Sequence, residues 1–161
     1  MTEKLIKKAM HAPDFLNEPA EYGKSFSRGI KASFREATIL FISGTASIDK
    51  SGNTLYPGNF PAQARRVFAN ITALLHSEGA RWSDVVQTRC YLSDMRDYGA
   101  FNEIRNRFYK KARLSPFPAS VCIAAHLCRP ELLVEIEAIA ILKKRRKSRV
   151  APFPAADKTL R

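Results

Sequence analysis

Residues 116–140 limit the possible fold more than any other part of this chain. They contain two apolar runs, at 119–125 and 132–141, separated by a short polar interruption at 126–131. Each run has the length of a buried strand, and the Cys, Arg and Pro residues between the runs are typical of a connection. We therefore expect two strands close to the end of the folded part of the chain.

The second of these runs carries two carboxylates, Glu135 and Glu137. Side chains two residues apart lie on the same face of a strand, so both acids point one way. The apolar Val134, Ile136 and Ala138 point the other way. Acidic side chains on an otherwise apolar strand need polar partners or a wet cleft. This face of the strand is the first candidate for chemistry.

The preceding sequence predicts the other elements of the domain. Strands are expected at 25–32, 38–46 and 85–92, a turn-rich loop at 49–58, and helices at 61–79 and 98–111. The first helix has an apolar stripe of Ala64, Val67, Phe68, Ile71, Leu74 and Leu75. Because both helices are apolar on one side only, we predict an α+β fold, a single mixed β-sheet with two helices on one face. The other face then needs a cover, most simply further copies of the chain in a closed ring.

The 161 residues are enough for one domain, which we place at 23–142. Residues 1–22 are expected to form an irregular lead-in, because Pro13 and Pro19 exclude a long helix. Residues 143–161 form a basic tail with eight of the 27 Lys and Arg residues and a single acid, within a net charge of +12. This tail could contact a polyanion such as RNA, or it could be a solvated, disordered terminus.

Several classes of function are disfavoured by what the sequence lacks. No apolar run approaches about 20 residues and no apolar leader opens the chain, so we expect a cytoplasmic protein that contacts no membrane. The three cysteines, Cys90, Cys122 and Cys128, have no metal-binding spacing, so we expect neither a disulfide nor a bound metal. No phosphate-binding or dinucleotide-binding motif is present, and we expect no cofactor.

A series of short motifs along residues 22–142 resembles the RidA family, the reactive intermediate deaminases. The set in this order, ending in VEIEAIA, is characteristic of that family. The matching pieces are Phe26-Ser27-Arg28-Gly29, Phe41-Ile42-Ser43-Gly44, Gly58 with Gln63, Asn70, Val85-Val86, Tyr91-Leu92, Asp94-Met95, Phe101-Asn102, Pro118-Ala119 and Leu133-Val134-Glu135-Ile136-Glu137-Ala138.

The resemblance implies a chorismate-mutase-like fold and a homotrimer with three clefts between its subunits. In the deaminating members each cleft hydrolyses an enamine or imine, such as 2-aminoacrylate, to a keto acid and ammonia. By this resemblance, Glu135 matches the catalytic Glu and Gly44 the backbone donor of the pocket. Phe26 stands where the family often has Tyr, Cys122 matches a pocket-lining Cys, and Asn102 matches a structural or rim position.

The chain also departs from the family at the arginine that binds substrate. The arginine of the P-A-R motif, which grips the substrate carboxylate, is replaced by Ser120. Loss of such a charged partner typically costs about 2–5 kcal/mol. Three alternatives follow: another cation binds the substrate carboxylate, the pocket binds a different kind of molecule, or the pocket binds its ligand without catalysing a reaction. Arg28 and Arg89 are the candidate substitutes, and Arg28 shares the face of Phe26 if both lie in a strand.

Three functions therefore stay open. The first is a RidA-like enamine or imine deaminase with altered substrate specificity, acting on a small molecule through Glu135. The second is a non-catalytic trimer that binds a small metabolite or a protein. The third is an RNA-directed role, because some relatives are described as endoribonucleases or translation inhibitors and the tail is basic. Glu137 has no catalytic counterpart in the family, and we expect a structural role for it.

Overall fold

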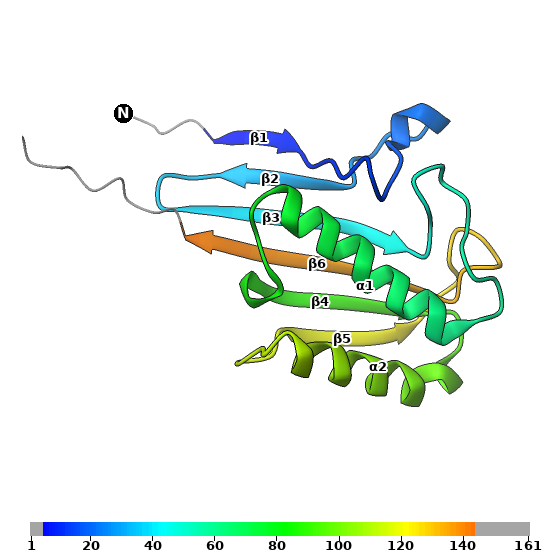
Figure 1. Ribbon diagram of the computed structural model, residues 1–161. Helices are drawn as coiled ribbons and strands as arrows, with labels where there is room; N and C mark the ends of the chain where they lie inside the picture. Colours follow the sequence, from blue (N-terminus) through cyan, green and yellow to red (C-terminus); the bar gives the residue numbers. More distant parts are fainter. Residues whose placement is uncertain (1–4, 144–161) are drawn as a thin grey trace, which may run out of the picture.

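The computed structural model describes residues 5–143 as a six-stranded sheet with two helices on one face (Figure 1). The strands lie in the order β1-β2-β3-β6-β4-β5, and β4 and β5 are the parallel pair in an otherwise antiparallel sheet. This arrangement confirms the predicted α+β class with a single mixed sheet. The strands are β1 (Ile6–Ala9), β2 (Gly29–Ser33), β3 (Ala37–Ala46), β4 (Val85–Leu92), β5 (Ala119–Ala124) and β6 (Val134–Lys143).

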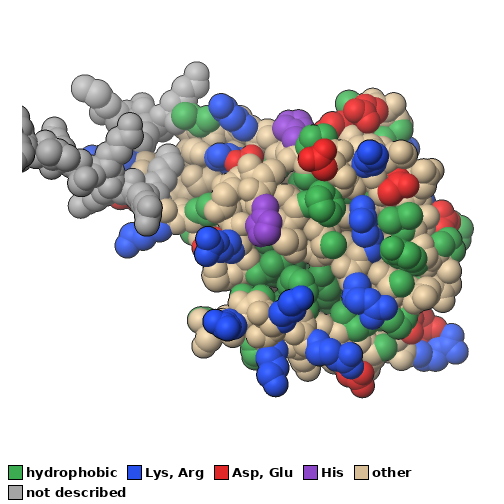
Figure 2. Space-filling model, viewed as in Figure 1, with side chains coloured by type: hydrophobic (Ala, Val, Ile, Leu, Met, Phe, Trp, Pro, Cys, Tyr) green, Lys and Arg blue, Asp and Glu red, His purple; other side chains and the backbone are tan. Residues whose placement is uncertain are grey.

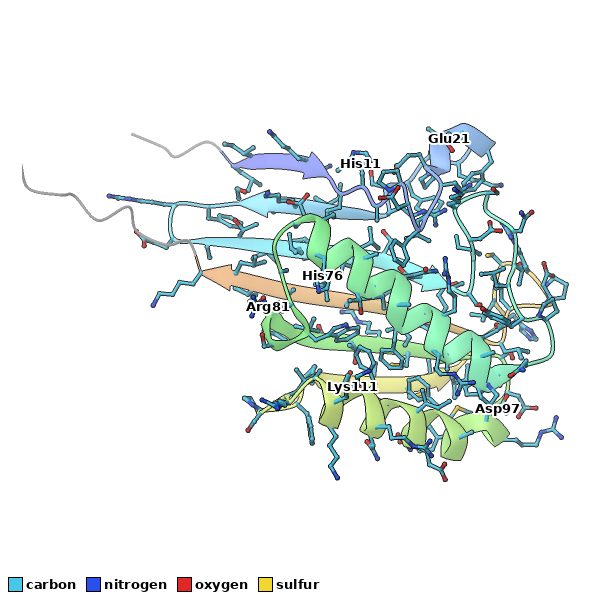
Figure 3. All side chains as sticks on the ribbon, in the orientation of Figure 1. His11, Glu21, His76, Arg81, Asp97 and Lys111 are labelled. Atoms are coloured by element: carbon cyan, nitrogen blue, oxygen red, sulfur yellow. The ribbon has the colours of Figure 1, made fainter. Side chains whose placement is uncertain are left out.

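Both helices lie close to their predicted positions, with ends set by local chemistry. Helix α1 (Phe60–Ser77) begins after Asn59, whose Oδ1 accepts a hydrogen bond from the Ala62 N–H at 3.1 Å. Helix α2 (Tyr98–Lys111) follows Asp97 and ends with two lysines. Figure 3 labels Asp97 and Lys111 at the two ends of α2. An acid before the first turn and bases in the last turn both suit the helix dipole.

The hydrophobic core fills the space between the helices and the sheet. The predicted stripe of α1 is buried there, opposite the core-facing side chains of β3, β4 and β6. Phe68 lies at the centre of an aromatic group, with ring centroids 4.6 Å from Phe108 and 5.5 Å from Trp82. The alternation along β6 is as predicted, because Val134, Ile136 and Ala138 are buried and the two glutamates are only partly covered.

The lead-in is more ordered than we predicted. It contains strand β1, paired antiparallel with β2, and a 3-10 helix, η1 (Pro19–Tyr22). Met10 and Leu16 are buried in the core. A four-residue edge strand with two lysines has no alternating apolar pattern, which explains why the sequence did not reveal it. The predicted tail lies outside the described residues, apart from Lys143 at the end of β6.

The sheet face opposite the helices carries exposed apolar side chains. Its members come from several strands of the sheet: Phe41, Val121, Ile123 and Ile141, each between 44% and 47% exposed. An apolar surface spread over neighbouring strands is typical of an interaction surface. On the helix side, Lys and Arg side chains are spread among hydrophobic ones (Figure 2). Within residues 5–143 there is no helix with the length and apolar character needed to span a bilayer.

Gln63 connects the start of α1 to the loop that leads into β6. Its side chain is fully buried, and Nε2 donates hydrogen bonds to the backbone carbonyls of Tyr56 (3.1 Å) and Glu131 (2.8 Å). Its Oε1 accepts a hydrogen bond from the Leu133 N–H at 2.9 Å. One side chain therefore satisfies three backbone groups of two loops.

We expect Gln63→Ala to lower the free energy of unfolding by about 1–3 kcal/mol, because it leaves these backbone groups without their partner. Urea unfolding followed by fluorescence measures the change. Gln63→Glu keeps the size and the acceptor but loses the two donors, so it should be destabilising as well. Unchanged stability in both variants would contradict the structural role assigned to this side chain.

Candidate functional site

A cleft of about 930 Å³ opens on the uncovered face of the sheet, beside Glu135. Three segments form its walls: residues 22–28, the end of β3, and the loop between β5 and β6. Its charged and polar lining comprises Tyr22, Lys24, Arg28, Ser43, Tyr91, His126, Cys128, Arg129, Glu135 and Glu137. The two glutamates predicted to share a face therefore line one cleft.

Glu135 is the unpaired acid of this cleft. Among residues 5–143, no side chain or backbone group donates a hydrogen bond to its carboxylate, and no cation forms an ion pair with it. Burial raises the pKa of the Glu135 carboxyl above its ordinary value, and the negative charge of Glu137 raises it further. A carboxylate with a raised pKa and no protein partner is suited to accept a proton from a bound molecule.

Glu137 is held differently. It lies directly across the β4–β6 ladder from Arg89, and the Arg89 Nη1 is 3.3 Å from its Oε2. Burial and the charge of Glu137 together raise the pKa of the neighbouring Tyr91, which lies across from Glu135. Arg89 therefore neutralises the second acid of the cleft rather than the first.

Gly44 lies against the Glu135 carboxyl group at an irregular point of β3. Ile42 pairs with Ala138 and Thr45 with Ile136, so Ser43 and Gly44 together face one residue of β6 in a β-bulge. A Cβ placed on Gly44 would come within 2.8 Å of the Glu135 Cδ, closer than real Cβ contacts. Any larger residue at position 44 would push the Glu135 carboxyl group out of this position, so the structure brings the predicted Gly44 and Glu135 together.

Phe26 and Arg28 also line the cleft, but they precede β2 instead of lying in it. The Arg28 guanidinium lies 5.5 Å from the centroid of the Phe26 ring. Arg28 is 5% exposed, and it donates hydrogen bonds to the Asn17 carbonyl, the Asn17 side chain and the Tyr22 hydroxyl. These bonds fasten the lead-in to the wall of the cleft.

Ser120 and Cys122 lie on the opposite face of the sheet from Glu135. Ser120 Oγ accepts a hydrogen bond from the buried Thr88 hydroxyl at 3.1 Å, and Cys122 pairs across the ladder with the buried Cys90. Both therefore point to the helix side of β5, at the edge of the sheet. In one chain, the structure does not bring these two predicted residues together with Glu135.

Arg105, on α2, is a residue that we did not predict. Its Nη1 donates a hydrogen bond to Ser120 Oγ at 3.3 Å, and its Nη2 donates one to the Oδ1 of Asn102 at 2.5 Å. Asn102 is thus brought to Ser120 through this guanidinium. The signal in the sequence is weak: Asn102 and Arg105 are three residues apart beside the apolar stripe of α2, which places them on neighbouring parts of one helix face.

The thiol of Cys122 is unsuited to nucleophilic chemistry at neutral pH. Burial raises its pKa to about 11. We expect iodoacetamide at pH 8 to modify the exposed Cys128 well before Cys122, because only about one Cys122 thiol in a thousand is ionised there. Peptide mass spectrometry after timed labelling measures both rates. Faster labelling of Cys122 would contradict this environment.

A metal centre is not formed by the described residues. Within 5–143, no group of three or more His, Cys, Asp or Glu side chains could hold a metal ion.

Comparison with known proteins identifies the family. The sequence model described as endoribonuclease L-PSP matches residues 17–142. A RutC family protein of Pyrococcus horikoshii is 33% identical over 124 residues, covering 77% of this chain and 91% of its own. A RutC family protein of Synechocystis is 32% identical over 143 residues, covering 88% of this chain and 98% of its own.

Solved structures agree on the architecture. The YjgF gene product of Escherichia coli superposes with a TM-score of 0.69 at 22% identity, covering 83% of this chain and 98% of its own. The chain therefore belongs to the endoribonuclease L-PSP family, and the resemblance to RidA proteins is confirmed together with the chorismate-mutase-like fold.

Proposed function

We propose that this protein hydrolyses a reactive enamine or imine to a carbonyl compound and ammonia. The observation that supports the proposal is the state of Glu135, an unpaired carboxylate with a raised pKa in a cleft large enough for a small metabolite. A purely structural carboxylate at this burial is normally paired with a cation or a hydrogen-bond donor. The type of reaction is proposed from the resemblance to the deaminating members of the family.

The proposed chemistry needs one proton acceptor and no cofactor. Glu135 accepts a proton from water as the water oxygen attacks the imine carbon, and the electrons of the C=N π-bond move to nitrogen. The nitrogen takes up that proton from Glu135 to give a carbinolamine. The hydroxyl proton of the carbinolamine then passes to the amino nitrogen, and ammonia leaves as the C–N bond breaks and the C=O bond forms. Because the pKa of Glu135 is raised, the same group is able both to take the first proton and to return it.

We propose that the working form is a homotrimer with its sites between subunits. Two observations support this assembly. The apolar side chains on the uncovered face need a cover, and Glu135 and Ser120 lie on opposite faces of the sheet in one chain. A cleft that contains both Glu135 and Ser120, as the resemblance implies, requires a second copy of the chain.

The experiment is to generate 2-iminopropionate in the presence of the protein and to measure its decay beside the spontaneous rate. Larger imines and imines without a carboxylate are included, because Ser120 replaces the family's arginine. Light scattering on the same sample gives the mass of the assembly. We expect accelerated release of the carbonyl compound from a particle of three chains, whereas no acceleration with any imine would reject the proposal.

RNA cleavage is the second candidate function, because the matching family carries the description endoribonuclease and the cleft contains Lys24, Arg28 and Arg129. Incubation with single-stranded RNA tests it. If cleavage disappears when the chain is cut after Leu142 while imine hydrolysis is unchanged, the RNA activity belongs to the basic tail and is separate from the cleft.

A further inference from the structure

We propose that Arg105 supplies the cation that position 120 lacks, and that its guanidinium binds the carboxylate of an anionic substrate. This inference rests on the proposed function, since it names the substrate class of the same site. It gives α2, an element that otherwise serves the core, a direct part in recognition.

The placement of Arg105 is the first support. Its guanidinium is held by Ser120 Oγ at 3.3 Å and by Asn102 Oδ1 at 2.5 Å, and it lies 5.3 Å from the centroid of the Phe101 ring. Two neutral hydrogen-bond acceptors and one aromatic face thus fix its orientation. The guanidinium therefore lies beside the side chain of residue 120 at the edge of β5, although it comes from the neighbouring helix.

The charge of Arg105 is also available. Among residues 5–143, no carboxylate forms an ion pair with it, whereas the neighbouring Arg107 pairs with Glu103 at 3.6 Å. Its two recorded bonds use two of the five N–H donors of a guanidinium. The remaining donors and the uncompensated charge suit a carboxylate ligand, which a guanidinium binds at two points.

The substitutes expected from the sequence lie elsewhere. Arg89 is paired with Glu137 on the opposite face of the sheet from Ser120. Arg28 lines the Glu135 cleft, but its recorded bonds hold Asn17 and Tyr22, and no contact joins it to Ser120 within the described residues. Arg28 is therefore the competing candidate, and the experiment must separate it from Arg105.

Pyruvate is a stable probe, because it carries the carboxylate without requiring turnover. Its affinity for the full-length protein is measured by calorimetry or NMR titration, beside that of the uncharged pyruvamide. We expect Arg105→Ala to weaken pyruvate binding about 10–100-fold and to leave pyruvamide binding unchanged. Arg107→Ala, on the same helix and 83% exposed in its side chain, is the matched control and should bind as the wild type does.

A second variant shows whether a loss of pyruvate affinity comes from the missing charge or from damaged packing. The double variant Arg105→Ala/Ser120→Arg moves the guanidinium from the helix to the strand, and we expect it to recover most of the pyruvate affinity. Recovery supports the proposal. A double variant as weak as Arg105→Ala, or a loss on Arg28→Ala with none on Arg105→Ala, overturns it.

The same variants test whether the site is shared between chains. Glu135→Gln and Arg105→Ala proteins are unfolded together and refolded as mixed assemblies. If each cleft takes Glu135 from one chain and Arg105 from another, about a quarter of the clefts in an equal mixture regain both groups. We expect imine hydrolysis at low substrate concentration to rise above the mean of the two separate variants, and no rise would overturn the shared arrangement.

Binding and turnover give separable answers. Pyruvate binding that depends on Arg105 in a protein that hydrolyses no imine rejects the proposed reaction and keeps the recognition residue. Imine hydrolysis with an unchanged KM in Arg105→Ala keeps the reaction and rejects the recognition residue.

Discussion

Replacing Glu135 by Gln is expected to lower kcat/KM for imine hydrolysis by about 10²–10⁴-fold. The amide keeps the shape of the side chain but is unable to take a proton from the attacking water. Because no residue within 5–143 forms a hydrogen bond or an ion pair with the carboxylate, no neighbour is placed to take over its task. The rate of carbonyl release from an imine generated in situ measures the loss.

Glu137→Gln is the matched control, an acid two residues away on the same face of β6. It should keep most of the activity. It also removes the negative charge that raises the pKa of Glu135 and frees the positive charge of Arg89, and both changes lower that pKa. The acidic limb of the pH–rate profile should therefore move to lower pH. Equal losses in the two variants would contradict the separate roles of the two acids.

Stability distinguishes an inactive Glu135→Gln protein from a misfolded one. The pKa of Glu135 is raised on folding, so its contribution to stability is present at low pH and is lost as the pH rises through the folded value. The Gln variant, which never ionises, should be more stable than the wild type near pH 7. The difference should shrink below the ordinary pKa of a glutamate.

Gly44→Ala is expected to lower kcat/KM by about 10–100-fold while leaving the fold intact. The added methyl group meets the carboxyl group of Glu135, and that side chain has to move away from its position beside β3. A displaced proton acceptor no longer matches the attacking water. Steady-state kinetics measure the loss, and circular dichroism reports on the fold.

Gly99→Ala is the control for this substitution. A Cβ at Gly99 would meet open space, and alanine favours the helical conformation that residue 99 adopts in α2. We expect unchanged activity and a stability equal to that of the wild type or about 0.5–1 kcal/mol higher. Full activity in Gly44→Ala would mean that the position of Glu135 against β3 is unimportant.

Most of the fold could be predicted from the sequence because it follows from hydrophobic periodicity. The stripe of α1 and the alternation of β6 state directly which side chains face the core. Strand β1 carries no such signal, since an edge strand of four residues is held by backbone pairing and its side chains are exposed. Its position could be found only in the assembled sheet.

In the candidate site, the positions of Glu135 and Gly44 could be predicted from the sequence, but the contact between Arg105 and Ser120 could not. Glu135 lies in the alternating pattern of β6, and Gly44 lies near the end of the apolar run that forms β3. The sequence therefore predicts the strand on which each of these residues lies. The contact between Arg105 and Ser120 joins a helix to a strand 15 residues later, and its geometry depends on how α2 lies against β5. By the resemblance, Ser120 stands where the family has an arginine, but only the folded chain shows that Arg105 lies beside it.

The β-bulge at Ser43 and Gly44 interrupts the regular pairing of β3 with β6 at the place where β3 borders the cleft. With regular pairing and no residue removed, Gly44 would lie opposite Ile136 and Thr45 opposite Glu135, so every side chain beyond the bulge would change sides. Thr45, which is buried now opposite Ile136, would then leave the core face of the sheet and lie on the face of Glu135. The bulge therefore sets which side chains of β3 face the core beyond it and leaves Gly44, a residue with no side chain, against the carboxyl group of Glu135.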